Sequence, residues 1–467
     1  MDKIEDNCGC CLAHSLHDAY NSTKSLGHRG RDSAGICAIN RSGRIDLVTW
    51  AGAVTRFDLG NLHEVLPGDY HTFLGHVRYA TKGKKEFALQ DAHPIAIGGR
   101  REVRGDHVIT RDCEMVAVHN GQVDNFYLKD IKGNFRTGTD TEKLLYYYKQ
   151  HGERGLLNDI PGAYTMAIAD KRRKDVVVFR DRTGIRPGIL GEKDGKKVFA
   201  SESIALTGNG ATIDEDLDPG SIYYFSHEGR VQKELIVSSK HRFCFFEYNY
   251  LAHVSSILND VSVNSVRIRL GEKLAEEFHP KVDFVTYLPR CPKPAAIAYA
   301  NKIGVEFLPI FYKPCSDRAF MDSTPDKRKS SIEKNLYLVP EIEEKIRGKS
   351  IVCIDDSVVR GNNSIRVREL LYNVGRVKEA YLASYTPKIG IIGKDKVKRG
   401  CLFGVDMPPN DNFIARGRSN KEINEQIGMP VKFLSLEGML KVYESLGVSR
   451  KSLCTFCIGG EHPLDSL

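Results

Sequence analysis

Two adjacent carboxylates and a small polar loop form the stretch of this sequence that most clearly indicates chemistry. Asp355 and Asp356 follow four apolar residues, 351–354, and precede a loop that ends with residues 361–364. The carboxylates can accept hydrogen bonds from vicinal ribose hydroxyls, and backbone N–H groups of the loop favour a phosphate. A buried strand followed by a solvated acidic turn also fits, but the ordered pattern as a whole indicates a site for a phosphorylated sugar.

The elements that must position this loop are a strand and a helix of a parallel sheet. Residues 351–354 predict a buried strand, and residues 364–375 predict the helix that returns over it. Upstream, residues 263–278 and 295–300 have helical spacing on either side of a strand-like run at 282–288. Strands that alternate with helices predict a parallel α/β sheet, with the loop at a strand's carboxyl end and a helix's amino end.

Cys8 begins a second group of reactive residues in the amino-terminal half. It follows a polar leader, residues 1–7. Removal of that leader would give Cys8 a free α-amino group with a pKa of about 7.7–8.0, which suits proton transfer near neutral pH. One residue would then provide both nucleophile and base. Cys8, Cys10 and Cys11 also fit the small buried residues of a first strand.

Four further residues match the needs of acyl transfer from a glutamine amide. That reaction requires hydrogen-bond donors for the oxyanion, a cation for the substrate's α-carboxylate and an anion for its α-ammonium group. Asn120 and the N–H of Gly121 can supply the donors, Arg78 the cation and Asp140 the anion.

Short β-type runs separated by Gly, Asp and Asn predict that strands dominate the amino-terminal half of the chain.

The ordered set of motifs resembles the glutamine phosphoribosylpyrophosphate (PRPP) amidotransferase family. The loop at 351–364 resembles the PRPP signature of type I phosphoribosyltransferases, and the Cys8 group resembles a class II glutaminase. The resemblance extends over nearly the whole chain. Its matching motifs are residues 28–35, 75–81, 119–121, 138–142, 179–187, 201–203, 246–248, 267–272, 351–364 and 404–408.

The resemblance implies two domains of different fold class. An α+β glutaminase of the amino-terminal-nucleophile type, an αββα sandwich, is expected over residues 8–240 after a propeptide, 1–7, that is removed autocatalytically. A parallel α/β phosphoribosyltransferase domain is expected over 241–467, with a cluster-ligand segment at its carboxyl end. Two domains also agree with the length, because 467 residues exceed what one hydrophobic core usually covers.

The activity implied by the resemblance is glutamine hydrolysis at Cys8 and internal transfer of ammonia to PRPP. The products would be 5-phosphoribosylamine, pyrophosphate and glutamate, in the first step of purine synthesis. The residues expected to bind PRPP are Asp355, Asp356, Arg360, Gly361, Asn362, Asn363 and Ser364. Two alternatives stay open: a divergent glutaminase whose sugar domain uses another acceptor or sugar, and a regulator that binds PRPP or a nucleotide.

Four cysteines form a candidate metal site. Cys454 and Cys457 are spaced as a CxxC, which fits either two thiolates on one metal or a redox pair. By resemblance, Cys244 and Cys401 complete the ligand set of the iron–sulfur members of the family. Four thiolates fit zinc or a [4Fe–4S] cluster, and the resemblance favours the cluster in a structural role.

Magnesium is expected at Asp355 and Asp356, but nearby loops depart from the family pattern. Arg290 stands where an aspartate is usual, and Cys291 replaces a serine that helps to hold magnesium. A thiol is a poor ligand for that hard cation, so Cys291, the candidate third ligand, would bind it weakly. The loop at 361–364 contains two asparagines where threonines are usual.

Further departures lie outside these two loops. The basic run at 326–331, within the segment 326–335, takes the place of the family's mobile lid, although such a run equally fits a solvated surface. In the glutaminase half, Arg31 replaces a usual glutamine, and Asp91 and His93 replace an asparagine and a second glutamine.

Composition describes an ordinary globular protein and limits its partners. The net charge of +8 is mild and does not form a basic tail, so we expect no nucleic-acid partner. We expect no membrane partner either, since no apolar run is long enough to cross a bilayer. Twelve cysteines without a secretory signal favour a reducing, cytoplasmic location. The resemblance implies a homo-oligomer, often a tetramer.

Overall fold

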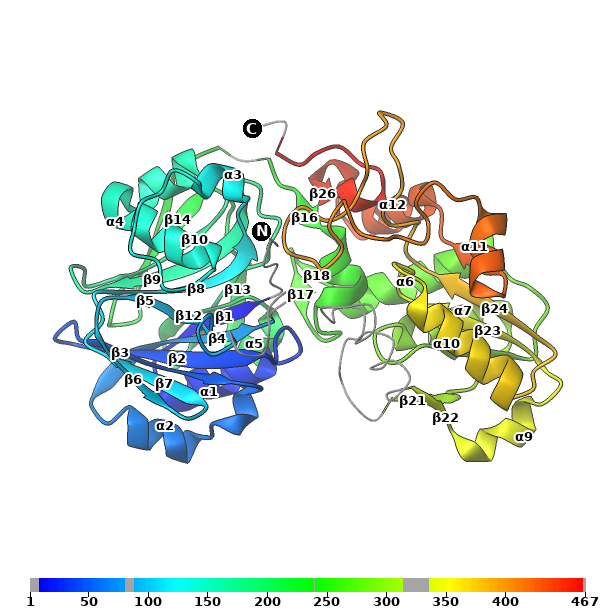
Figure 1. The fold of residues 1–467 in the computed structure, drawn as a ribbon, viewed down its shortest axis with the longest axis horizontal. Helices are drawn as coiled ribbons and strands as arrows, with labels where there is room; N and C mark the ends of the chain where they lie inside the picture. The colour runs from blue at the N-terminus through cyan, green and yellow to red at the C-terminus, as the bar shows by residue number, and fades with distance from the viewer. Residues whose placement is uncertain (1–7, 80–87, 239, 314–335, 465–467) are drawn as a thin grey trace.

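The computed structural model describes residues 8–79, 88–238, 240–313 and 336–464. Two halves of different architecture lie side by side, with the stacked sheets of the amino-terminal half on the left of Figure 1 and a smaller sheet with its helices on the right. One hydrophobic cluster extends through both halves, so the contact between them is packed rather than open.

The amino-terminal half contains two antiparallel sheets. The first has nine strands in the order β13-β11-β12-β1-β4-β2-β3-β7-β6, and the second has six in the order β15-β14-β10-β9-β8-β5. The strands of the first are β1 (Gly9–Ala13), β2 (Ser33–Asn40), β3 (Ile45–Ala51), β4 (Tyr70–Arg78), β6 (Arg100–Arg104), β7 (His107–Arg111), β11 (Ile189–Lys193), β12 (Lys196–Ala200) and β13 (Thr212–Asp216). Those of the second are β5 (Ile95–Ile97), β8 (Met115–Gln122), β9 (Ala163–Asp170), β10 (Val176–Arg180), β14 (Ser221–Phe225) and β15 (Val231–Leu235).

Alternating side chains explain why the two sheets stack and why helices cover their outer faces. Cys10 and Leu12 of β1 point into the core between the sheets, whereas Cys11 and Ala13 point to the opposite face. That outer face packs against α1 (Leu16–Ser25), α2 (Leu59–Val65) and α5 (Ser203–Thr207). The outer face of the six-stranded sheet packs against α4 (Asp140–Asp159), beside the short α3 (Asn125–Leu128). The predicted αββα sandwich is confirmed.

The carboxyl-terminal half is built on a five-stranded parallel sheet in the order β20-β19-β23-β24-β25. Its strands are β19 (Phe284–Tyr287), β20 (Glu306–Phe307), β23 (Ser350–Asp355), β24 (Glu379–Ser384) and β25 (Val431–Phe433). Side chains on both faces of β23 are buried, in two different clusters. One face packs against α6 (Val263–Glu277), α7 (Lys293–Ile303) and α12 (Leu436–Ser445), and the other against α10 (Asn362–Glu369) and α11 (Asn420–Ile427). The predicted parallel α/β architecture is therefore confirmed.

Predicted and observed elements agree closely around the sugar-site loop. The strand predicted at 351–354 is β23, and the helix predicted at 364–375 begins two residues earlier, at Asn362. Gly361 caps that helix with a left-handed backbone (φ +84°), a conformation that glycine adopts without strain. After Glu369 the helix continues as a π-helical turn, Leu370–Val374.

Short elements connect the two halves and close the chain. The first strand after the sandwich, β16 (Phe243–Cys244), pairs in parallel with β26 (Leu453–Cys454) near the end of the chain. The remaining elements are β17 (Ile257–Leu258), β18 (Val261–Ser262), β21 (Phe311–Tyr312), β22 (Tyr337–Leu338), α9 (Glu343–Ile346), a π-helical turn at Glu247–Leu251, and 3-10 turns at Val54–Arg56, Pro340–Ile342, Arg450–Ser452 and Phe456–Ile458. In the part of the chain described, no helix is long and apolar enough to span a membrane.

Candidate active site

Cys8 lies at the end of a sheet, next to the predicted carboxylate-binding arginine. The register of β1 and β4 pairs Gly9 with Val77, and one further step brings Cys8 opposite Arg78. Both residues are buried, and the Nη2 atom of Arg78 lies 3.6 Å from Oδ2 of Asp91. The structure therefore brings the predicted nucleophile and the predicted cation together at the ends of neighbouring strands.

Asn120 and Gly121 lie near the end of β8 and have the features of an oxyanion site. Asn120 is fully buried, and among the described residues neither its Oδ1 nor its Nδ2 atom has a hydrogen-bond partner. A Cβ atom on Gly121 would lie 2.1 Å from the carbonyl oxygen of Ala163, so the backbone approaches too closely for any other residue. A buried amide without a protein partner is costly, and an oxyanion formed during the reaction would satisfy its Nδ2 donor.

Asp140 begins α4 and supplies a carboxylate on the same side of the sandwich. Its Oδ2 atom accepts a 2.9 Å hydrogen bond from the N–H of Val123. Burial raises the pKa of Asp140 to about 6. His119 Nδ1 lies 3.6 Å from Asp140 Oδ1, but burial lowers the pKa of His119 to about 3, so this imidazole is neutral near pH 7. A cationic substrate group would therefore be a favourable partner for the carboxylate.

A cluster of three histidines, His76, His93 and His119, packs beside these residues and was not predicted from the sequence. The hydroxyl of Thr141 lies 2.8 Å from His93 Nε2 and 2.9 Å from His119 Nδ1. His76 lies 2.9 Å from the carbonyl oxygen of His119 and stacks on His93 at 4.6 Å between ring centroids. The cluster ties β4 and β8 to the start of α4. His93 stands out in the sequence only as a replacement for glutamine.

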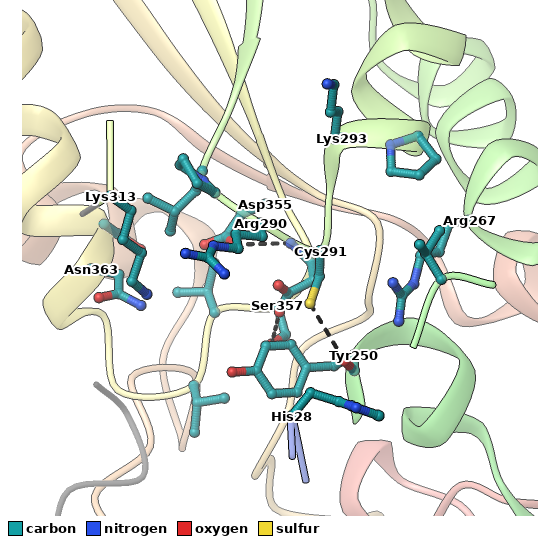
Figure 2. Close-up of a pocket in the computed structure, with 18 of the residues that line it drawn as sticks. His28, Tyr250, Arg267, Arg290, Cys291, Lys293, Lys313, Asp355, Ser357 and Asn363 are labelled. Carbon is teal, nitrogen blue, oxygen red and sulfur yellow. Dashed lines mark hydrogen bonds between the residues drawn. The ribbon is translucent and has the colours of Figure 1, made fainter. Parts of the chain in front are cut away.

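A cavity of about 450 Å³ lies at the carboxyl ends of β19 and β23, where the sugar site was predicted. Figure 2 shows labelled side chains around this space, including Asp355, Arg290, Cys291 and Asn363. It is lined by His28, Arg31, Tyr250, Ala252, His253, Val254, Arg267, Lys313 and residues 288–291, 293–294 and 355–364. All seven residues predicted to bind PRPP line it, and so do His28 and Arg31 of the amino-terminal half.

The paired carboxylates are held in place by short-range hydrogen bonds. The N–H of Asp356 donates to Asp355 Oδ1 at 2.9 Å, and the hydroxyl of Ser357 donates to Asp356 Oδ1 at 2.7 Å. Both aspartates are buried. Burial, and then the charge of Asp356, raise the pKa of Asp355 well above its usual range. A cation or a set of sugar hydroxyls would relieve this repulsion.

The loop after the carboxylates is shaped by Gly361 and Arg360. Gly361 has a left-handed backbone, and a Cβ atom there would lie 2.4 Å from Ile414 Cδ1, so another residue would be strained and would displace the end of the Ile414 side chain. Arg360 lines the cavity but donates 2.7 Å to the carbonyl oxygen of Asp406 and forms an ion pair with Asp411. Arg360 therefore also connects the loop that follows the carboxylates to the segment that contains Asp406 and Asp411.

The departures at Arg290 and Cys291 both face the cavity. The thiol of Cys291 donates to the carbonyl oxygen of Tyr250 at 3.4 Å, the contact drawn in Figure 2. Arg290 is exposed and lines the same cavity as Asp355. Together with Arg31, Arg267, Lys293 and Lys313 it makes the lining rich in cations, as a polyanionic ligand requires.

A second, smaller cavity brings together the four cysteines of the predicted metal site. Cys244, Cys401, Cys454 and Cys457 all line it, with apolar neighbours such as Phe246. Burial raises the pKa of Cys454 to about 12, so without a metal its thiol is protonated. Within the described ranges, no three or more His, Cys, Asp or Glu side chains converge closely enough to hold a single metal ion.

A buried ion network, also unpredicted, lies where the two halves meet. Arg29 donates to both Glu202 and Glu247, with distances of 2.9 and 3.0 Å to the Glu247 oxygens. Arg186 donates to Glu247 at 3.1 Å, and Arg29 Nε donates to the carbonyl oxygen of Cys8 at 2.8 Å. The motifs that contain these residues are visible in the sequence, but their partners are distant in the chain.

Two predictions concern residues outside the described ranges. They are the propeptide at 1–7 and the lid within 326–335.

Comparison with known proteins gives matches along the full chain. A family model for the glutamine amidotransferase domain matches residues 71–243. The amidophosphoribosyltransferase of Archaeoglobus fulgidus is 30% identical over 96% of this chain and 94% of its own length. That of Bacillus subtilis is 28% identical over 96% of this chain and 91% of its own length.

Two solved structures match with the same coverage, 98% of this chain and 97% of theirs. One is the glutamine PRPP amidotransferase of B. subtilis complexed with ADP and GMP, with 26% identity and a TM-score of 0.80. The other is described as the allosteric regulatory enzyme of purine biosynthesis, with 27% identity and a TM-score of 0.82.

Proposed function

Because this chain belongs to the amidophosphoribosyltransferase family, we propose that it makes 5-phosphoribosylamine from PRPP and glutamine-derived ammonia, the first step of purine biosynthesis. One observation carries the proposal. The cavity that contains Asp355 and Asp356 is also lined by His28 and Arg31, from the half that contains Cys8. Residues of both halves therefore line the proposed sugar-phosphate site, which supports a link between it and the proposed glutaminase site.

In the glutaminase half, Cys8 is the nucleophile, and its own α-amino group, once residues 1–7 are removed, accepts the thiol proton. The sulfur attacks the amide carbon of glutamine, and the oxyanion is stabilised by Asn120 Nδ2 and the N–H of Gly121. Arg78 binds the α-carboxylate and Asp140 the α-ammonium group. The amino group returns the proton to the leaving ammonia, and water then hydrolyses the thioester to glutamate.

In the transferase half, ammonia attacks C1 of the ribose and pyrophosphate leaves. Asp355 and Asp356 bind the ribose hydroxyls, and the backbone N–H groups at 361–364 bind the 5′-phosphate at the start of α10. Confinement of ammonia and PRPP in one cavity replaces a bimolecular encounter with an oriented one. Arg290 and neighbouring cations favour the developing charge on pyrophosphate.

We propose magnesium as a cofactor at this site. Asp355 and Asp356 offer the hard oxygen donors that magnesium prefers. Burial, and then the charge of Asp356, raise the pKa of Asp355, so a cation at this pair would be favourable. Magnesium would neutralise the leaving pyrophosphate. Cys291 fits the cation poorly, because its sulfur is soft and bonded to the carbonyl oxygen of Tyr250.

We propose that the four cysteines hold a [4Fe–4S] cluster rather than zinc. The donor set is entirely sulfur and the walls are apolar, which fits an iron–sulfur cluster. A single zinc ion requires all four sulfurs about 2.3 Å from one point. A cluster binds each sulfur to a separate iron, so its ligands surround a space as these four cysteines do.

The remaining assignments follow from family membership and stay proposals. The domains are 8–240 and 241–467, Cys8 is exposed by autocatalytic removal of 1–7, and the enzyme is a cytoplasmic homo-oligomer. Its substrates are glutamine and PRPP.

The test combines intact mass with two activities of the purified protein. We expect the mass of a chain that starts at Cys8, and PRPP-dependent formation of glutamate and phosphoribosylamine. Cys8→Ala should abolish the glutamine-dependent reaction but keep the reaction with ammonium salts. Glutamine hydrolysis without any PRPP turnover would instead support a glutaminase with another acceptor, and PRPP binding without either activity would support a regulator.

A further inference from the structure

Residues 288–293, the loop after β19 and the first residue of α7, bring two cations to the cavity of the carboxyl-terminal half and no side-chain oxygen. Arg290 and Lys293 are the charged residues of this loop, and Cys291 is its one other polar residue. All three line the cavity. Magnesium binds oxygen donors and binds sulfur poorly. The loop can therefore attract an anion, but its side chains are unsuited to hold a magnesium ion.

The loop lies on the same edge of the sheet as the paired carboxylates. β19 and β23 are parallel neighbours with Tyr287 opposite Ile354, so the loops that follow them leave the sheet side by side. The N–H of Leu288 donates to the carbonyl oxygen of Ile354 at 2.9 Å, which fixes the start of the loop beside Asp355. One cavity therefore has an acidic part and a basic part that adjoin.

Contacts after Arg290 hold the other end of the loop. The thiol of Cys291 donates to the carbonyl oxygen of Tyr250 at 3.4 Å. The N–H of Ala296 donates to the carbonyl oxygen of Pro292 at 2.8 Å, which begins the eleven-residue helix α7. The first turn of this helix also lines the cavity, and a helix amino end carries partial positive charge. The backbone around Arg290 is therefore fixed and favours an anion.

Two other arginines of the lining are engaged with the protein itself. Arg267 donates to the carbonyl oxygens of Tyr248 and Ala252 at 2.9 and 2.8 Å. Arg360 donates to the carbonyl oxygen of Asp406 at 2.7 Å. Both guanidinium groups therefore serve in part to hold neighbouring loops.

The remaining cations of the lining are placed less favourably for the basic part than Arg290. Burial raises the pKa of Asp355 most, and the positive charge of Lys313 is among the effects that lower it, so Lys313 acts on the acidic part. Lys293 also lines a second groove, between α6 and α7. Arg31 comes from the amino-terminal half. Arg290 is thus the exposed arginine that the carboxyl-terminal half itself presents to the cavity.

We propose that Arg290 binds the diphosphate of PRPP directly and supplies the positive charge that a magnesium ion would otherwise supply, so that diphosphate binding here does not require the metal. The inference rests on the proposed function and adds to it a substrate-binding residue and the metal-free form of the diphosphate. A guanidinium group can donate two parallel hydrogen bonds to a phosphate, and it is always charged near neutral pH. Magnesium at Asp355 and Asp356 then serves the ribose end.

The test is a calorimetric titration of the whole purified chain with inorganic pyrophosphate, in the presence of EDTA. The wild-type protein should bind pyrophosphate without magnesium. In Arg290→Gln the dissociation constant in EDTA should rise about tenfold or more, as expected for the loss of a charge-assisted hydrogen bond. Arg347→Gln, which changes an exposed arginine outside the cavity lining, should keep the wild-type constant. Thermal melting of both variants should match the wild type, because both side chains are exposed.

A double variant tests whether the chemistry of the loop decides the need for metal. Arg290→Asp combined with Cys291→Ser gives the loop the carboxylate and hydroxyl that are usual in the family. This protein should fail to bind pyrophosphate in EDTA and should bind it when magnesium is added. Binding in EDTA as tight as that of the wild type would count against the inference.

The outcomes separate this inference from the proposed function. Pyrophosphate binding by the wild type only with magnesium, or an unchanged constant in Arg290→Gln, overturns the inference even when the enzyme makes phosphoribosylamine. A wild-type protein that makes no phosphoribosylamine overturns the proposed function. In that case, metal-free binding that depends on Arg290 would still support this residue as the diphosphate-binding group of the cavity.

Discussion

Cys244 and Cys454 are direct partners in the parallel pairing of β16 with β26. The first strand after the sandwich is thereby joined to the last strand of the chain. The pairing also brings Cys457 to the cavity that Cys401 lines from a separate loop. A cluster here would hold together the three segments that contain Cys244, Cys401 and Cys454 with Cys457. Ile185 and Arg186 of the amino-terminal half line the same cavity.

The first prediction concerns that cluster. Protein purified without oxygen should contain about four iron and four acid-labile sulfide per chain, the content of one [4Fe–4S] cluster. Cys454→Ser should lose most of both, because a serine hydroxyl is a poor ligand for iron–sulfur clusters. Thermal melting should shift downwards in the same variant, since metal binding and folding are linked.

Cys113→Ala is the control, because Cys113 is a buried cysteine that lies between the sheets, away from this cavity. It should keep the wild-type iron and sulfide content. Zinc alone, or no metal, in the wild-type protein would contradict the cluster.

Much of the fold follows from local patterns that the sequence displays. The apolar run before Asp355 corresponds to a real strand, β23, because a strand buried on both faces needs apolar residues at successive positions. The family inferred from the ordered motifs and the two fold classes are confirmed by the relatives and solved structures. The domain boundaries stay a prediction.

The sequence could not predict which charges meet where the halves join. Arg29 and Glu247 are part of recognisable motifs, but the ion pair between them depends on how the halves pack. The same holds for Arg31, which belongs to the amino-terminal half yet lines the cavity of the other. Such contacts are tertiary, and no spacing along the chain encodes them.

A second prediction concerns Asn120. Asn120→Ala should lower kcat for glutamine hydrolysis about 10²–10³-fold, with little change in KM, because the lost N–H acts on the oxyanion and not on the substrate. The reaction with ammonium salts should stay at the wild-type rate. Thermal melting should also change little, since among described residues the Asn120 amide has no hydrogen bond to lose. A kcat within threefold of the wild-type value would contradict the assignment of Asn120 to the oxyanion site.

The last prediction is a pH dependence of ligand binding that arises from Asp140. Burial raises the pKa of this carboxyl to about 6, so it is protonated at a higher pH than usual and loses its charge as the pH falls through 6. A ligand with an α-ammonium group should then bind more weakly. For glutamate as a competitive inhibitor of the processed enzyme, Ki should rise about tenfold from pH 7 to pH 5, in proportion to the lost ionised fraction.

Asp140→Asn is the variant that separates this effect from other titrations. An asparagine can still accept the hydrogen bond from Val123 N–H through its amide oxygen, but it carries no charge at any pH. Its Ki for glutamate should therefore be high and constant between pH 5 and 7. The raised pKa also means that the ionised carboxyl destabilises the substrate-free fold above pH 6, so the variant should melt no lower than wild type at pH 7. A wild-type Ki that does not change over this range would show that Asp140 does not bind the ammonium group.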